Sequence, residues 1–119
     1  MSPHTRAMVA AAAHAFICGR KIVGVHDHEF GKDMRIAAEA QGERLQGFDG
    51  DRAAKFDGSS SEIYDAVDDA FVSLEIDGLK AHGYDRRTSS HYTLSVLGRV
   101  VQLYDHASRS WFAYTIQVG

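Results

Sequence analysis

Hydrophobic and polar residues alternate along most of this chain, in short runs that stop near glycines. Counting back two, four and six positions from Gly98 gives Val96, Leu94 and Tyr92, with polar residues between them. The same alternation precedes Gly78. Strict alternation of this kind predicts β-strands that bury one face.

A unit of about twenty residues recurs five times, and each copy has a glycine followed by a ring side chain and an aspartate. The copies run from Gly19 to His26-Asp27, Gly42 to Phe48-Asp49, Gly58 to Tyr64-Asp65, Gly78 to Tyr84-Asp85 and Gly98 to Tyr104-Asp105. Glycine is the residue that tight turns need where φ is positive. The pattern therefore predicts five β-hairpins, each turning at its glycine.

The segment from Trp111 to Val118 predicts one further strand, with Phe112 and Tyr114 on its inward face. We expect it to pair with the first strand and close the sheet, since closure removes both edges. The expected fold is all-β: about eleven antiparallel strands, as a meander of five hairpin repeats plus a closing strand, in a barrel or a radial array. We expect a single domain over residues 1–119.

The first residues add a helix to this expectation. Ser2 followed by Pro3 is typical of a helix start, so a short helix from Pro3 to about Ala11 is predicted. It precedes a first strand that we place at residues 13–17, and it would cover one end of a barrel.

Composition narrows the classes of function. Of the 119 residues, 45% are apolar and 24% charged, which is typical of a globular domain. The net charge of −3 argues against a nucleic-acid partner, and no apolar stretch is long enough to cross a membrane, so no membrane partner is expected. The single Cys18 suits a reducing compartment. Residues 2–13 only loosely resemble a signal peptide, because His14 interrupts the apolar run, and a cytoplasmic location is expected.

The repeat brings its aspartates to one end of the fold. Carboxylates in a ring can bind a divalent cation, whereas an aspartate at a turn also accepts hydrogen bonds from backbone amides two residues on. The rings that precede them can stack on a ligand or cover the rim of the barrel. The candidate ligand-binding residues are Tyr64, Tyr84, Tyr104, Asp65, Asp85 and Asp105.

The densest group of potential metal ligands is His26-Asp27-His28-Glu29. His26 and His28 project to one side of an extended chain and are the candidate metal ligands for zinc or iron. A third ligand would come from His4, His82, His91 or His106. The alternative is that these residues form a solvated turn. No nucleophile with a histidine partner is evident around Cys18 or residues 59–61, which argues against an enzyme.

Cations recur two residues after the glycine, at Lys21, Arg44 and Lys80. A closed barrel would then have a basic end and an acidic end, which favours head-to-tail self-association or steering of an anionic ligand. Cations on exposed strands also protect those strands against aggregation, without any partner.

The repeat, with its aromatic-Asp step and turn glycine, resembles the β-flower proteins from Gly19 to Asp105. That resemblance implies hairpins arranged like petals about an axis and no established activity. The leading hypothesis is a small soluble, non-catalytic β-repeat module without a cofactor, which binds a protein or small molecule or forms a homo-oligomer. The alternative is a metal-dependent enzyme or small-ligand-binding barrel that uses His26 and His28.

Overall fold

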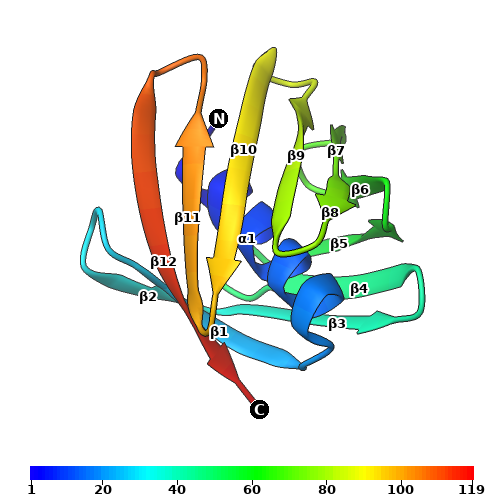
Figure 1. Ribbon diagram of the computed structural model, residues 1–119. Helices are drawn as coiled ribbons and strands as arrows, with labels where there is room; N and C mark the ends of the chain where they lie inside the picture. The colour runs from blue at the N-terminus through cyan, green and yellow to red at the C-terminus, as the bar shows by residue number, and fades with distance from the viewer.

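The computed structural model describes residues 1–119 as one helix and twelve strands (Figure 1). In chain order the elements are α1 (Pro3–Cys18), β1 (Ile22–Asp27), β2 (Lys32–Met34), β3 (Ile36–Gln41), β4 (Arg44–Asp49), β5 (Ala54–Ser59), β6 (Glu62–Asp65), β7 (Ala70–Ser73), β8 (Glu75–Asp77), β9 (Lys80–Asp85), β10 (Ser90–Leu97), β11 (Val100–Asp105) and β12 (Ser110–Val118).

Ten of the strands form a closed antiparallel barrel, which confirms the predicted fold class. Around the barrel the order is β1, β3, β4, β5, β6, β7, β9, β10, β11 and β12, and β12 pairs with β1 to complete the circle. The short strands β2 and β8 pair with β1 and β9 outside this circle. The last strand closes the sheet as predicted, but its partner is Ile22–Asp27 and not residues 13–17.

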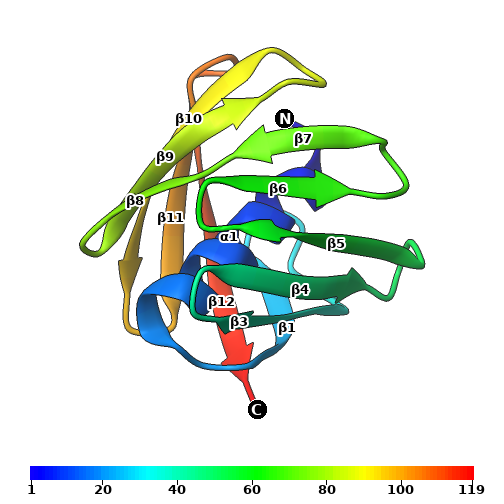
Figure 2. The ribbon, with the colours of Figure 1, turned by 90° about the vertical axis from the view of Figure 1, so that its right-hand side faces the viewer.

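Helix α1 lies inside the barrel. In Figure 1 its first turns lie behind β10 and β11, and in Figure 2, turned by 90°, they lie behind β6 and β7, whereas its C-terminal end emerges from the barrel in both views. Every residue from Ala7 to Ala13 is at most 1% exposed. The predicted stop at Ala11 and the predicted strand at 13–17 are wrong, because the helix continues to Cys18. A helix buried on all sides has no polar face, so the periodicity that identifies a surface helix is absent.

Gly19 ends this helix and turns no hairpin. Its φ of 65° is left-handed, and its N–H donates a hydrogen bond to the carbonyl of Ala15. Further along the helix, Nε2–H of the buried His14 donates to the carbonyl of Gly98, 2.8 Å away. The C-terminal half of α1 is thereby fixed to the turn between β10 and β11.

Three of the five predicted turn glycines are confirmed. Gly42, Gly78 and Gly98 begin two-residue turns with φ between 61° and 63°. Gly58 lies within β5, paired with Ile63, and a Cβ there would lie 2.0 Å from the carbonyl oxygen of Glu62. Glycine is needed at Gly58 for close backbone approach and not for a turn.

Side chains from the sheet fill the space around α1. Leu74 and Val96, at the inward positions of the alternation before Gly78 and Gly98, are 1% and 3% exposed. Gly83 pairs with Tyr92, whose ring packs inward and whose hydroxyl donates a 2.7 Å hydrogen bond to the carbonyl of Ser73. Burial raises the pKa of this phenol. The helix and these side chains leave the outer surface and the two ends for any ligand.

No helix in the structure has the length and hydropathy of a membrane-spanning segment.

Candidate functional sites on the rim and outer face

Five equivalent loops lie at one end of the barrel, which we call the aspartate rim. Each begins after the aspartate that ends a strand, contains four residues, and leads into the next strand. The fourth loop residue always has a positive φ, between 49° and 59°. These fourth residues are Gly31, Ala53, Asp69, Ser89 and Arg109. One backbone conformation is thus repeated five times around the rim.

The rim aspartates hold these loops from inside. Asp27, Asp49, Asp65, Asp85 and Asp105 are 1–2% exposed. In each, Oδ1 accepts a hydrogen bond of 2.8–3.1 Å from the backbone N–H two residues later. Each of these buried carboxylates therefore caps its own turn, as the second of the two interpretations expects.

Arg52 joins three carboxylates at this rim. Its guanidinium donates to Asp65 Oδ2 at 2.9 Å, to Asp68 Oδ1 at 3.1 Å and to Asp49 Oδ2 at 3.3 Å. Burial alone would raise the pKa of Asp65, but the hydrogen bonds from Arg52 and from two backbone amides outweigh it, so that pKa lies below its usual range. Burial opposes the charge of Arg52 as well, and the carboxylates nevertheless raise its pKa.

The start of α1 completes this polar layer. The amino group of Met1 lies 3.1 Å from Asp105 Oδ2, and Arg6 donates to Glu29 at 3.2 Å and to the hydroxyl of Tyr114 at 3.3 Å. Burial raises the pKa of Tyr114 to about 12. The guanidinium of Arg6 also lies 3.7 Å from the centre of the Phe112 ring. Cations from Met1 and from the first turn of α1 therefore compensate carboxylates from the loops.

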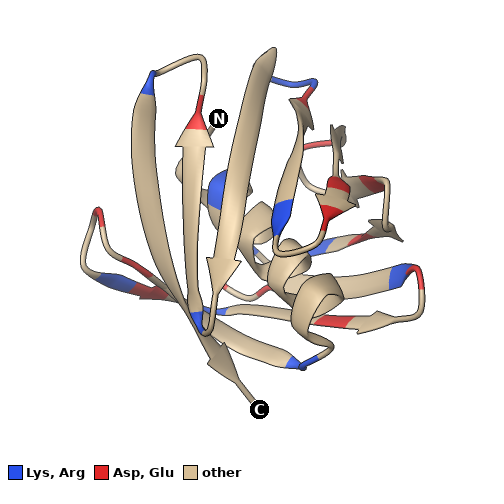
Figure 3. Ribbon diagram, in the orientation of Figure 1, with Lys and Arg blue, Asp and Glu red and all other residues tan.

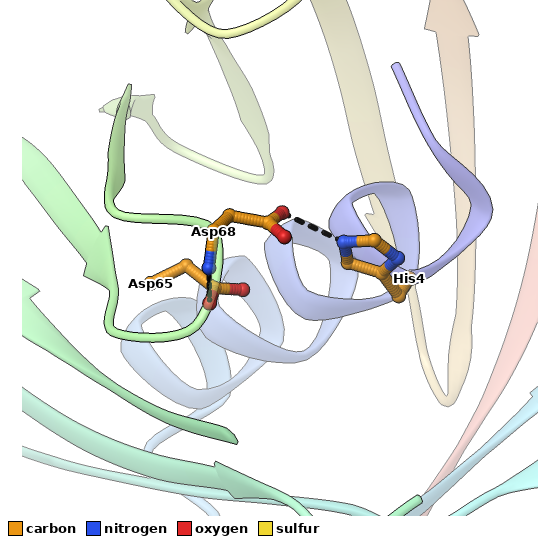
Figure 4. Close-up of side chains that lie close together, drawn as sticks. All are labelled: His4, Asp65 and Asp68. Carbon is orange, nitrogen blue, oxygen red and sulfur yellow. Dashed lines mark hydrogen bonds and ion pairs between the residues drawn. The ribbon is translucent and has the colours of Figure 1, made fainter. Parts of the chain in front are cut away.

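One group of three potential metal ligands lies in this layer. His4, Asp65 and Asp68 have ligand atoms within 4.8 Å of one another, and His4 Nε2–H donates to Asp68 at 2.7 Å (Figure 4). Arg52 already binds both carboxylates and supplies the positive charge that a cation would bring. The arrangement is explained as an ion-pair network.

Ser2, His4 and Asp68 superficially resemble a hydrolytic triad. Ser2 Oγ lies 3.2 Å from His4 Nε2, but Asp68 Oδ2 contacts that same nitrogen at 2.7 Å. A histidine that activates a serine uses one ring nitrogen for the serine and the other for the carboxylate. This geometry cannot pass a proton from Ser2 to His4 while Asp68 orients the ring.

The two histidines predicted as metal ligands do lie together. The rings of His26 and His28 are 4.9 Å apart, His26 Nδ1–H donates to Asp33 at 2.8 Å, and His28 Nε2 lies 2.6 Å from Thr115 Oγ1. The four histidines considered as a third ligand have other neighbours: His4 contacts Asp68, His82 contacts Glu75, His91 contacts Tyr84 and His106 contacts Tyr104. The structure thus offers two imidazoles, each with a hydrogen-bond partner.

The rings that precede the rim aspartates lie on the outer face, each beside a partner on the next strand. Tyr64 packs against Phe71 at 4.9 Å between ring centres, Tyr84 against His91 at 4.6 Å, and Tyr104 against Trp111 at 5.0 Å. The Tyr64 hydroxyl donates to Asp69, which raises its pKa. The candidate residues Tyr64, Tyr84 and Tyr104 therefore share one level of the barrel, just outside the buried Asp65, Asp85 and Asp105.

The aromatic residues are densest on β9–β12. Tyr104 contacts both Trp111 and His106, and the N–H of His106 donates to the carbonyl of His91, which joins this group to Tyr84. Trp111, the only tryptophan, is 66% exposed. A hollow of about 230 Å³ lies beside it, lined by Gln102, Trp111, Phe112 and Ala113.

Charge is unevenly distributed around the barrel (Figure 3). Residues 44–79, which form β4–β8, have three Lys or Arg against nine Asp or Glu, whereas residues 80–119, which form β9–β12, have five against two. Both of those two, Asp85 and Asp105, are buried. We call the outer surfaces of these segments, with their loops, the acidic face and the basic face.

This differs from the basic and acidic ends that the sequence predicted. Arg86, Arg87 and Arg109 lie in loops of the aspartate rim, whereas Lys80 and Arg99 lie at the opposite end. The basic face therefore extends along the whole height of β9–β12. Arg86 pairs with Glu62 at 2.7 Å, whereas Arg87, Arg99 and Arg109 are in no ion pair.

Sequence reasoning missed the residues that bind the rim together. Arg52 stands six residues before Gly58, where the alternation with Ala54 and Phe56 would place an apolar side chain, and this exception was the available signal. Asp68 follows no repeated pattern, so nothing in the sequence singled it out. Trp111 was placed correctly on the face opposite Phe112 and Tyr114, but its neighbours could not be identified before the hairpins were paired.

No protein-family model matches this chain, and neither a characterised protein nor a solved structure is significantly similar to it.

Proposed function

We propose that this protein is a non-catalytic binding module that recognises an acidic protein surface through the basic face on β9–β12. The observation that carries the proposal is the composition of that face. It combines an exposed Trp111 and its aromatic neighbours with three arginines free of ion pairs, and it exposes no Asp or Glu side chain.

These residue types suit protein recognition. Tryptophan, tyrosine and arginine dominate the binding energy of protein interfaces. The aromatic rings bury much surface at little entropic cost, and arginine adds directed hydrogen bonds to carboxylates. Arg87 and Arg109 lie in neighbouring loops beside the aromatic group, where their guanidinium groups can pair with carboxylates in a bidentate way. The partner that matches this surface is acidic and presents groups that pack on aromatic rings.

Other surfaces support a binding role less well. The interior is filled by α1, so a small-ligand barrel would have no cavity to use. The rim carboxylates are buried and already hydrogen-bonded. The His26 and His28 pair carries no comparable cluster of exposed rings and unpaired cations.

Fluorescence of Trp111 tests the proposal, since no other tryptophan contributes. We expect poly-L-glutamate, added at low salt as a model acidic chain, to change this emission saturably, and poly-L-lysine to leave it unchanged. The double variant Arg87→Glu with Arg109→Glu should bind poly-L-glutamate at least about tenfold more weakly. The matched control, Asp57→Lys with Glu75→Lys on the acidic face, should leave this binding as tight or tighter.

Equal binding by the wild type and the Arg87→Glu, Arg109→Glu variant would overturn the proposal. So would tighter binding of oligodeoxythymidylate than of poly-L-glutamate at equal charge, because single-stranded nucleic acid also combines negative charge with stacking groups.

A further inference from the structure

We infer that the acidic surface recognised by the basic face is the acidic face of a second copy of this chain. The inference rests on the proposed function and names its partner. It places β9–β12 of one copy against β4–β8 of the next, in a head-to-tail arrangement.

The acidic face has the complementary properties. Asp51, Asp57, Asp69, Glu75 and Asp77 are all exposed there. The exposed cations among its strands are Arg44 and Lys55. None of the five carboxylates is paired with a lysine or arginine. The charges that β9–β12 would attract are therefore present on the same molecule.

Aromatic surface accompanies these carboxylates. Phe48 and Phe71 are 42% and 40% exposed. Asp57 lies in a hollow of about 360 Å³, whose other charged and aromatic lining residues are Arg44, Glu62, Tyr64 and Phe71, so two carboxylates face one cation there. A guanidinium beside a carboxylate and over a ring gains both an ion pair and a cation–π contact. Within one chain, Arg86 already makes this combination, since it pairs with Glu62 and lies 5.8 Å from the centre of the Phe71 ring. Arg87 or Arg109 of a second copy would repeat it at Asp57.

The two faces meet where β7 and β8 pair with β9, but their centres point in different directions. In the circular order of ten strands, the middle of β4–β7 is separated from the middle of β9–β12 by four strands in one direction and six in the other. An interface between two different faces leaves one of each face free on the complex, so further copies can add and form a ring or a filament. Attraction of this kind weakens as salt screens it, since the Debye length falls to about 3 Å at 1 M.

A complementation experiment tests the inference with the full-length chain, by light scattering after size exclusion. We expect assemblies above the 13.1 kDa protomer mass in low salt, which shrink as salt is added. The basic-face variant (R87E with R109E) and the acidic-face variant (D57K with E75K) should each form no larger species alone. Their equimolar mixture should form a complex of twice the protomer mass, because one intact face remains on each. All substituted side chains are exposed, and circular dichroism checks that both variants are folded.

A wild type that stays at the protomer mass in low salt would overturn the inference, as would a mixture that forms no complex while the wild type assembles. The proposed function is separable from it. If the protein is monomeric yet poly-L-glutamate still binds through Arg87 and Arg109, the acidic partner is another protein and only the self-association is wrong.

Discussion

The two ends of the barrel join antiparallel strands by different physical means. At the aspartate rim, five loops close on buried carboxylates, which Arg52, the start of α1 and backbone amides compensate. At the opposite end, three turns depend on glycines with φ near 62° and on no buried ion pair. The first end is therefore sensitive to charge and the second to backbone conformation. Repeated strands need not be stabilised in the same way at both ends.

Removing the charge at the centre of the aspartate rim should have the largest effect. Arg52→Met keeps most of the side-chain volume but leaves Asp49, Asp65 and Asp68 without their shared cation. We expect the free energy of unfolding to fall by about 3 kcal/mol, as measured by urea denaturation. Arg44→Met is the matched control, since Arg44 is exposed and in no ion pair, and it should change stability by less than about 0.5 kcal/mol. Equal losses in the two variants would contradict a special role for the rim.

Acid should weaken the same end. The pKa values of Asp65 and Asp105 are depressed in the folded protein, so the stability they add is complete above the ordinary carboxyl pKa of about 4 and is lost as pH falls through the depressed values. We expect Tm to decrease steeply below about pH 4. Asp65→Asn should lower Tm at pH 7, at a cost of about 2 kcal/mol, and flatten this acid dependence. A control, Asp57→Asn, should retain the wild-type slope.

Adding a methyl group to a turn glycine should cost more at the end opposite the aspartate rim than at the rim itself. Gly98→Ala places a Cβ in open space, so its cost of about 1 kcal/mol comes from the φ of 61° alone. Gly31→Ala makes the same change at the aspartate rim, where the equivalent loops hold Ala53 and Ser89 at that position. Chemical denaturation should therefore show a smaller loss for Gly31→Ala. A larger loss for Gly31→Ala would contradict the expectation that the rim loops accept a side chain at this position more readily than the glycine turns do.

The smallest expected effect is a gain. Ala53 has a φ of 50°, and Ala53→Gly relieves that left-handed conformation while it adds freedom to the unfolded chain. We expect a net stabilisation of about 0.5 kcal/mol, measured as a small rise in Tm. A loss of similar size would mean that the loop conformation is not strained at this position.

The strands of the barrel were readable from the sequence because each buries one face, so period-two alternation survives in it. The aspartates were readable as turn residues for a similarly local reason, since their bonds reach only two residues along the chain. Helix α1 has neither a one-sided pattern of burial nor a local hydrogen-bonding motif that would identify it. Ala13 and Ala15 alternate with His14 and Phe16 by coincidence, and what made this segment a helix is the surrounding barrel, which no local pattern records.

The sequence predicts the charge of the candidate surfaces but not where those surfaces lie on the barrel. The excess of cations in residues 80–119 can be counted from the sequence, but the position of those residues relative to β4–β7 depends on the circular strand order. Arg52 illustrates the same limit. Its partners Asp49 and Asp65 end different strands, and only the pairing of β4 and β6 with β5 between them brings both to one guanidinium.

Because helix α1 lies at the centre of the barrel, strands from both halves of the chain are needed to bury it. The alanine-rich helix is shielded from water only in the closed barrel, where Ser110–Val118 pairs with Ile22–Asp27, so a chain without β12 would leave apolar helix surface exposed. Deleting β12 should therefore give a protein that aggregates. Dividing the chain into two fragments should do the same, and the fragments should become soluble only when they are mixed.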